Sequence, residues 1–170
     1  MDDHKVIIKE LEAFEGVLLH IQKEGVSRDV NQRLSDFFRF LDEEIVRHHV
    51  EEEKILFPLL QERLLEKGEH GQGSAITTAV DMMEDDHIKV MQLAAVTFNF
   101  LGFAPRLPDP ASQALVLDAA LEQGKTLVEL SQLHIFREDN IVFPLAQQHL
   151  SPNELDDMES QLSALSDTRT

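Results

Sequence analysis

One segment of this chain occurs twice, and the repeat limits what the chain can fold into. Residues 48–59 recur in outline at residues 134–145, with histidine first, glutamate four positions later, and isoleucine, phenylalanine, proline and leucine in matching places. No gap is needed to align the two copies. The tripeptide Asp-Asp-His at 2–4 likewise recurs at 85–87. The second half of the chain therefore resembles a copy of the first half.

Apolar residues repeat at three- and four-residue steps along most of the chain, which indicates amphipathic helices. Glycine-rich and proline-rich stretches separate four long helical segments, expected at about 2–23, 27–67, 74–102 and 111–149. Ser151-Pro152-Asn153-Glu154 has the pattern of a helix cap and predicts a short fifth helix. Because short connections favour antiparallel neighbours, the predicted fold class is all-α: an antiparallel up-down-up-down four-helix bundle with a short C-terminal helix. The bundle is expected over residues 1–150, followed by the short helix and a frayed tail at 151–170.

Composition narrows the possible chemistry. The 170 residues suit one domain and include no cysteine, so disulfides, thiolate ligands and iron–sulfur clusters are excluded, and any metal must be held by nitrogen and oxygen. The formal net charge of -17 argues against nucleic acid or an anionic membrane as a partner. No apolar run approaches the ~20 residues of a membrane span, and the first residues lack a secretion signal. We therefore expect a cytoplasmic protein.

The repeated polar residues suggest a metal site. His48 and Glu52 are four positions apart, as are His134 and Glu138, so each pair projects from one face of its helix. The following isoleucines place that face toward the core. A histidine and a carboxylate buried there need a partner, since burial without one costs several kcal/mol. A single such pair would be explained by a histidine–carboxylate hydrogen bond or a surface ion pair, but two copies in the same context favour a metal ion.

Helix heights indicate which histidines can meet. At ~1.5 Å per residue, His4, His48, His87 and His134 fall at similar heights in antiparallel helices, whereas His20 lies ~20 Å away. The other histidines, His20, His70 and His149, are therefore interpreted as non-ligands.

Four imidazoles and two carboxylates exceed the four ligands of a closed zinc site and divide naturally between two metal ions. Iron suits this ligand set, with zinc, manganese or copper as alternatives. The ferritin-like design of Glu-x-x-His on two helices is matched only by Glu84 and His87. The predicted metal ligands are His4, His48, Glu52, His87, His134 and Glu138, with the two glutamates as bridges.

In content and order these motifs resemble the hemerythrin-like, HHE cation-binding domains. The resemblance covers residues 2–150 and rests on His4, His-His-x-x-Glu-Glu-x-x-Leu-Phe-Pro at 48–58, Asp-Asp-His at 85–87, and His134, Glu138 and Phe-Pro at 143–144. It implies a non-haem centre of two iron ions, Fe²⁺ or Fe³⁺, with carboxylate bridges and a bridging oxide or hydroxide. The implied function is the binding or sensing of a small ligand such as O₂, NO or peroxide.

Two features depart from the oxygen-carrying members of that family. Met91 stands where they place a second histidine, and Glu138 follows His134 by four positions where they have an aspartate at five. A thioether is a poor ligand for ferric iron, so one iron would gain an open position. Simple oxygen transport is therefore not the only interpretation. A redox enzyme that removes peroxide or repairs iron centres, and an iron-sensing regulatory module, remain alternatives.

The sequence indicates the roles of the residues beside the predicted ligands less clearly. His49 and Glu53 are turned partly off the core face but could orient ligands. Glu51, Asp85 and Asp86 are expected to be solvated charges. Prolines at 58 and 144 each remove a helix hydrogen bond and predict kinks beyond the site. Six phenylalanines are expected to pack in the core or between helices, at positions 37, 38, 40, 98, 100 and 103.

Overall fold

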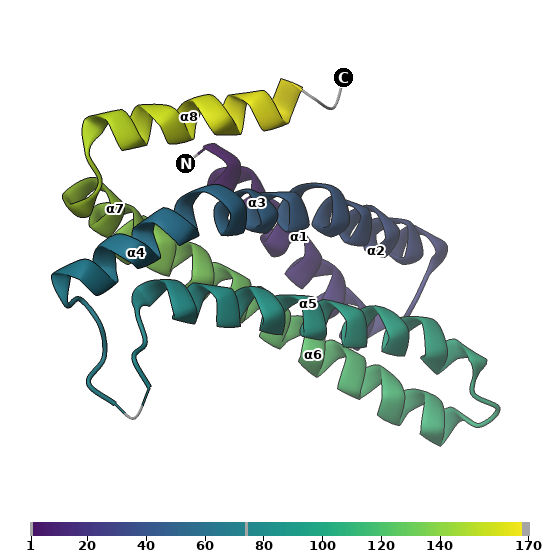
Figure 1. Cartoon of the computed structure of the whole chain (residues 1–170). Coiled ribbons are helices and arrows are strands. Elements are labelled where there is room, and N and C mark those ends of the chain that lie inside the picture. The colour runs from purple at the N-terminus through teal and green to yellow at the C-terminus, as the bar shows by residue number, and fades with distance from the viewer. Residues whose placement is uncertain (1, 74, 168–170) are drawn as a thin grey trace. The chain divides into compact units, whose positions relative to one another are not determined.

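A computed structural model describes residues 2–73 and 75–167, and the regular elements of this part of the chain are all helices (Figure 1). The predicted all-α class is therefore confirmed. The α-helices are α1 (Asp2–Glu24), α2 (Arg28–Phe40), α3 (Val46–Glu51), α4 (Phe57–Lys67), α5 (Ala79–Phe103), α6 (Pro110–Arg137), α7 (Phe143–His149) and α8 (Pro152–Asp167). The shorter turns are the π-helical η1 (Leu41–Ile45), η2 (Glu52–Leu56) and η4 (Glu138–Val142), and the 3₁₀ turn η3 (Ala104–Arg106).

The predicted second helix is confirmed as one continuous helical stretch, because α2, η1, α3, η2 and α4 follow one another without a break. Ser27 caps its start, where the Ser27 hydroxyl oxygen accepts a hydrogen bond of 3.2 Å from the Val30 N–H. Gly68 ends it in the left-handed conformation, with φ of 72°, which a glycine adopts without a Cβ clash.

The predicted start of the third helix is wrong. Ser74 lies outside the described residues, but residues 75–78 are not helical and α5 begins at Ala79. Thr78 and Asp81 form the cap: the Thr78 N–H donates to Asp81 Oδ2 at 2.6 Å, and the Val80 N–H donates to the Thr78 hydroxyl at 3.1 Å. These bonds lower the pKa of Asp81 below its ordinary value and satisfy N–H groups that a helix start leaves free.

The helices group into two compact units that alternate along the chain. The first unit consists of Met1–Ile45 and Asp86–Ile135, and the second of Val46–Asp85 and Phe136–Thr170. The core of the first unit includes a stack of Phe14 on Phe37, with ring centroids 3.8 Å apart and ring planes 4° from parallel. Gly124 of α6 lies against Leu18 of α1, and a Cβ there would come within 2.8 Å of Leu18 Cδ1. The absent side chain at 124 lets these helices pack closely.

The second unit has its own hydrophobic core. It is built from Phe57, Leu60 and Leu64 of α4, together with apolar residues of α5, η4 and α7. Helix α8 packs Leu155 and Met158 against it, so the predicted C-terminal helix is confirmed and is longer than expected. Burial of these two side chains helps to hold α8 against the core.

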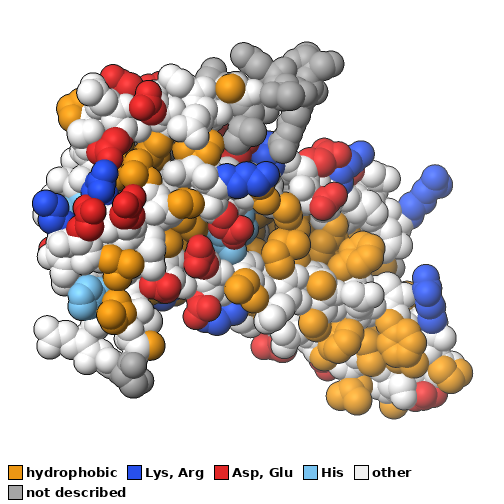
Figure 2. Space-filling view, viewed as in Figure 1, with side chains coloured by type: hydrophobic (Ala, Val, Ile, Leu, Met, Phe, Trp, Pro, Cys, Tyr) orange, Lys and Arg blue, Asp and Glu red, His pale blue; other side chains and the backbone are white. Residues whose placement is uncertain are grey.

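Some phenylalanines expected in the core lie at the surface. Phe37 is buried as expected, but Phe98 is 58% exposed and Phe103 51% exposed. Hydrophobic side chains gather over the C-terminal end of α5 and the first turns of α6 (Figure 2). Apolar residues occur on all sides of this end of α5, so one helix face is buried and the others meet solvent.

The stretch Ala79–Arg106 is long and apolar enough, by length and composition alone, to cross a membrane. In its most apolar part, 22% of the residues are buried. The expectation that no segment approaches a membrane span therefore does not hold for this helix. Core helices of soluble proteins can have the same length and composition.

The cap of α8 leads to a prediction about stability at low pH. Hydrogen bonds from the Ser151 N–H, the Arg63 guanidinium of α4 and the Ser151 hydroxyl hold the pKa of Glu154 at about 2, below its ordinary value of 4.5. A carboxylate with a lowered folded-state pKa stabilises the fold above pH 4.5, and this stabilisation is lost as the pH falls from about 4.5 to about 2.

We therefore expect Glu154→Gln to lower the thermal midpoint at pH 7, and the difference from the parent protein to shrink as the pH falls through that range. Glu159→Gln, an exposed change on the same helix, serves as the control for the altered net charge. Thermal unfolding followed by circular dichroism measures both. Equal midpoints for the Glu154 and Glu159 variants at pH 7 would contradict the assignment.

Candidate metal centre

Two of the predicted ligands lie at the first residue of a π-helical turn. Glu52 begins η2 and Glu138 begins η4, and each turn is followed by phenylalanine and proline. The Phe57 N–H bonds back to the Glu52 carbonyl, and the Phe143 N–H to the Glu138 carbonyl, five residues earlier in both cases. A proline next in the chain has no N–H and its ring would collide with the carbonyl four residues before it. The wider turn accommodates the proline, so the expected kinks take the form of π-turns.

The second unit brings three predicted ligands together. His48 Nε2 lies 3.6 Å from Glu52 Oε1 and 3.8 Å from Glu138 Oε2. One nitrogen or oxygen of each of the three side chains lies within 4.8 Å of the others. Glu52 is 6% exposed and Glu138 is fully buried. The repeat thus places its two glutamates close together, with the His48 imidazole near both.

Electrostatics make this arrangement costly without a cation. Burial, followed by the nearby charge of Glu138, raises the pKa of the Glu52 carboxyl well above its ordinary value, and Glu53 and Glu51 add to the effect. Two carboxylates removed from water repel each other more strongly than they would at the surface. A divalent or trivalent cation bound between them would reverse that repulsion, because it favours the charged form of both.

The first unit brings two further predicted ligands together. His87 of α5 and His134 of α6 are 3% and 2% exposed, and their Nε2 atoms lie 3.1 Å apart. The Asp86 carboxylate lies 3.9 Å from Nδ1 of His134. A carboxylate on that side favours a proton on Nδ1, which leaves the Nε2 lone pair available to a metal. His4, the remaining predicted ligand, is 2% exposed in the first turn of α1.

The donor atoms fit a metal ion. Two nitrogens bound at right angles to one ion, with bonds of ~2.1 Å as for zinc and imidazole, would lie about 3.0 Å apart. The two Nε2 atoms of the first unit lie 3.1 Å apart. The second unit supplies two carboxylates and one imidazole, the oxygen and nitrogen donors that iron, manganese and zinc accept. That all six side chains belong to one centre stays a prediction.

Three neighbours of the ligands are more buried than the sequence indicated. Asp86 is 3% exposed and faces His134, so it is not a solvated charge. Glu51 is 9% exposed and pairs with Arg47 at 3.2 Å. His49, expected partly off the core face, is 6% exposed, with its ring centroid 6.3 Å from that of His48. The recurrence of Asp-Asp-His in both halves was the one sequence signal that could have marked Asp86.

Several other residues predicted to lie outside the ligand set are at or near the surface. Asp85 is exposed, as expected of a solvated charge. His20 is an exposed side chain that lies 3.8 Å from Glu24 one turn along, and His70 is partly exposed. The Met91 side chain is 39% exposed, so the methionine that replaces an expected histidine is not part of a buried ligand set.

A family model decides what kind of domain this is. The hemerythrin HHE cation-binding domain matches residues 1–146, which is most of the chain and includes every predicted ligand. The chain belongs to the hemerythrin HHE family. The resemblance found in its motifs is thereby confirmed, and the His/Glu clusters of this hemerythrin-like domain are those of a metal-binding protein.

Curated relatives of this hemerythrin-like chain include iron–sulfur cluster repair proteins. It is 28% identical over 148 residues to the iron–sulfur cluster repair protein YtfE of Cronobacter sakazakii, and 26% identical over 148 residues to that of Salmonella typhimurium. Each match covers 85% of this chain and 60% of the relative. The chain thus spans less than two thirds of the length of the proteins it matches. No solved structure matches it.

The buried carboxylate pair predicts opposite effects of one substitution on the metal-free and metal-loaded protein. Glu52→Gln removes one ionisable group from the buried pair, so we expect it to raise the thermal midpoint of the metal-free protein. The same change removes a predicted ligand, so the rise in thermal midpoint on adding ferrous iron should be largely lost.

Glu62→Gln is the matched control, since Glu62 is an exposed carboxylate of α4, further along the same helical stretch. It should change little in either the thermal midpoint of the metal-free protein or the rise in that midpoint on adding ferrous iron. Thermal unfolding with chelator and with ferrous iron under nitrogen gives both values. A Glu52→Gln protein that responds to iron as fully as the parent would rule out Glu52 as a ligand.

Proposed function

We propose that this hemerythrin-like domain is a non-haem di-iron protein that binds or senses a small ligand such as O₂, NO or peroxide. The observation that carries the proposal is the pair of buried carboxylates, Glu52 and Glu138, held with His48 in the second unit. Neighbouring carboxylates with almost no solvent contact call for a cation, and family membership supports one.

The proposed ligand set is His4, His48, Glu52, His87, His134 and Glu138, with the glutamates bridging two ions. An antiparallel four-helix arrangement of residues 1–150 would supply ligands from each long helix, as carboxylate-bridged centres in bundles require. The absence of cysteine supports iron bound by nitrogen and oxygen rather than by sulfur.

The chain's own residues have separate tasks in this proposal. Glu52 and Glu138 balance the positive charge, and the imidazoles hold the ions in place. Asp86 keeps the proton of His134 on Nδ1. Met91, exposed and a poor ligand, leaves one ion with fewer protein donors. Bound iron would supply redox chemistry and a coordination position that a small molecule can occupy.

Metal content tests the ligand set. The parent protein, purified without chelator and reconstituted with ferrous iron under nitrogen, should hold two iron ions per chain by elemental analysis. His134→Ala should hold one or fewer, because it removes an imidazole from the buried pair. His20→Ala, which changes a surface histidine, should retain two. Retention of two ions by the His134 variant, or one ion in the parent, would contradict the proposal.

A second candidate function is the repair of damaged iron centres. It is favoured by the relatives named iron–sulfur cluster repair proteins, of which this chain spans 60%. Repair would require the domain to exchange iron with another protein, whereas ligand binding would not.

Nitric oxide separates the two candidate functions. We expect the reduced, iron-loaded domain to bind NO reversibly, with a saturable change in its visible spectrum that Glu52→Gln removes. Incubation with an enzyme whose iron–sulfur cluster has been damaged by NO tests repair. Recovery of that enzyme beyond what an equal amount of free ferrous iron gives would favour repair. No spectral change with NO would contradict ligand binding.

A further inference from the structure

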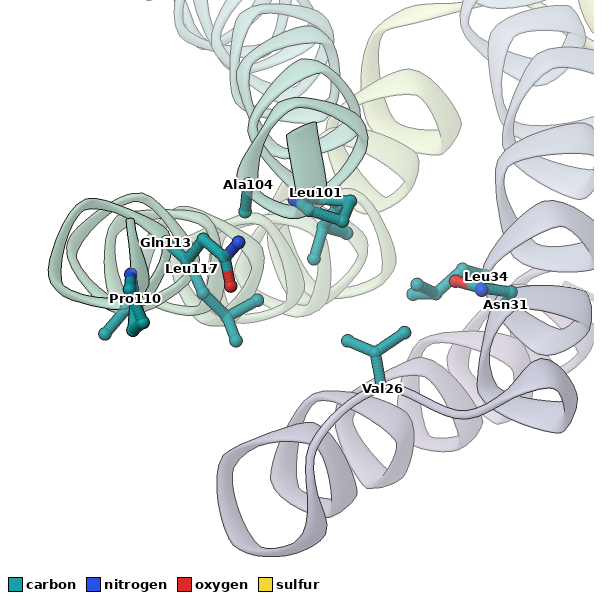
Figure 3. Close-up of a pocket in the computed structure, with 10 residues that line it drawn as sticks. Val26, Asn31, Leu34, Leu101, Ala104, Pro110, Gln113 and Leu117 are labelled. Carbon is teal, nitrogen blue, oxygen red and sulfur yellow. The ribbon is translucent and has the colours of Figure 1, made fainter. Parts of the chain in front are cut away.

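The first unit contains a cavity far along α5 from the histidine pair. It measures about 430 Å³ and is lined by the segment between α1 and α2, by the end of α5, by η3 and by the start of α6 (Figure 3). Leu101 lines it and follows His87 by 14 residues on the same helix, which is ~21 Å of helix. The cavity therefore lies outside the candidate metal centre.

The walls of the cavity are mainly aliphatic. Val26, Leu34, Leu101 and Leu117 face it, and Pro105 and Pro110 stiffen the connection that forms one side. Val26 is 50% exposed although it is a branched apolar side chain. Covering such a surface with an apolar molecule releases water and favours binding by roughly 25 cal/mol per Å² covered. The volume falls in the range of small-molecule pockets, roughly 300–1,000 Å³.

Two side-chain amides provide the polar groups of the cavity. Gln113 Nε2 donates a hydrogen bond of 2.7 Å to the Leu107 carbonyl, which fixes the amide because that carbonyl can only accept. The oxygen of Gln113 is thereby turned toward the cavity, and Asn31 approaches from α2 on the opposite wall (Figure 3). The Gln113 oxygen is therefore an oriented acceptor, available to a donor on a ligand.

The lining also limits the charge of a ligand. No charged side chain is among the residues that form the walls. A phosphate or carboxylate would therefore lose its hydration without gaining a cation, which is unfavourable. An aliphatic surface with one oriented acceptor suits a neutral molecule that has an apolar body and a hydroxyl or N–H donor.

We propose that this cavity is a second binding site, which takes a small neutral molecule with an apolar body and a hydroxyl group. The hydroxyl donates to Gln113 Oε1, and the apolar body lies against Leu101 and Leu117. Asn31 offers a further donor and acceptor at the opposite wall. The site does not depend on the proposed iron centre, since none of its residues is a candidate ligand.

The probe that tests the site is 2-naphthol, titrated into the full chain. Its fluorescence is read without interference, because the chain contains no tryptophan and no tyrosine. We expect saturable binding of one molecule per chain. Ala114→Phe, which fills the cavity from α6, should weaken binding more than tenfold, and Gln113→Leu should weaken it about tenfold through the lost hydrogen bond.

Two matched controls distinguish binding in the cavity from nonspecific binding of 2-naphthol to the protein surface. Ala111→Phe adds the same ring at an exposed position of α6 that does not line the cavity, and Gln123→Leu removes an amide elsewhere on that helix. Both should bind 2-naphthol as the parent does, and circular dichroism confirms that each variant is folded. Absence of saturable binding to the parent, or equal binding by the Ala114→Phe protein, would overturn the proposal.

Discussion

The burial of Glu52 and Glu138 side by side is the constraint on which the functional account depends. Each carboxylate is almost entirely removed from water, and each raises the cost of charging the other. Such a pair is unfavourable in a protein that only has to fold, because apolar residues of similar size would stabilise the same core. The pair is understandable if a cation binds between the two groups, and the π-turns that begin at these residues give both copies of the motif the same geometry.

The two units contribute different donors. The first unit holds an imidazole pair, His87 and His134, with Asp86 behind one ring. The second holds the carboxylates and His48. Imidazole nitrogens alone fit several transition metals, whereas carboxylate oxygens beside an imidazole favour harder cations such as iron or manganese. Each unit thus contains donor atoms suited to a metal ion, and this supports metal binding independently of the sequence match to the hemerythrin family.

Much of this could be predicted from the sequence because the repeat carried polar as well as apolar residues. Two His-x-x-x-Glu motifs in one context identified the clustered glutamates, and capping residues such as Ser27 and Gly68 marked helix ends correctly. The sequence does not reveal the start of α5, because Ser74 has the residue type of a cap whereas Thr78 and Asp81 form the actual cap. Burial of Asp86 and exposure of Phe98 were missed for one reason: both depend on what packs across a helix, which periodicity along a single helix does not reveal.

An anomalous difference map at the iron absorption edge, from crystals of the iron-loaded domain, tests the central claim most directly. It reports the position of each ion relative to all six proposed ligands at once, so it also tests whether the donors of the two units meet. The account predicts two peaks per chain, with Glu52 and Glu138 contacting both and the histidines divided between them. A single peak, or iron bound away from the two glutamates, would contradict it.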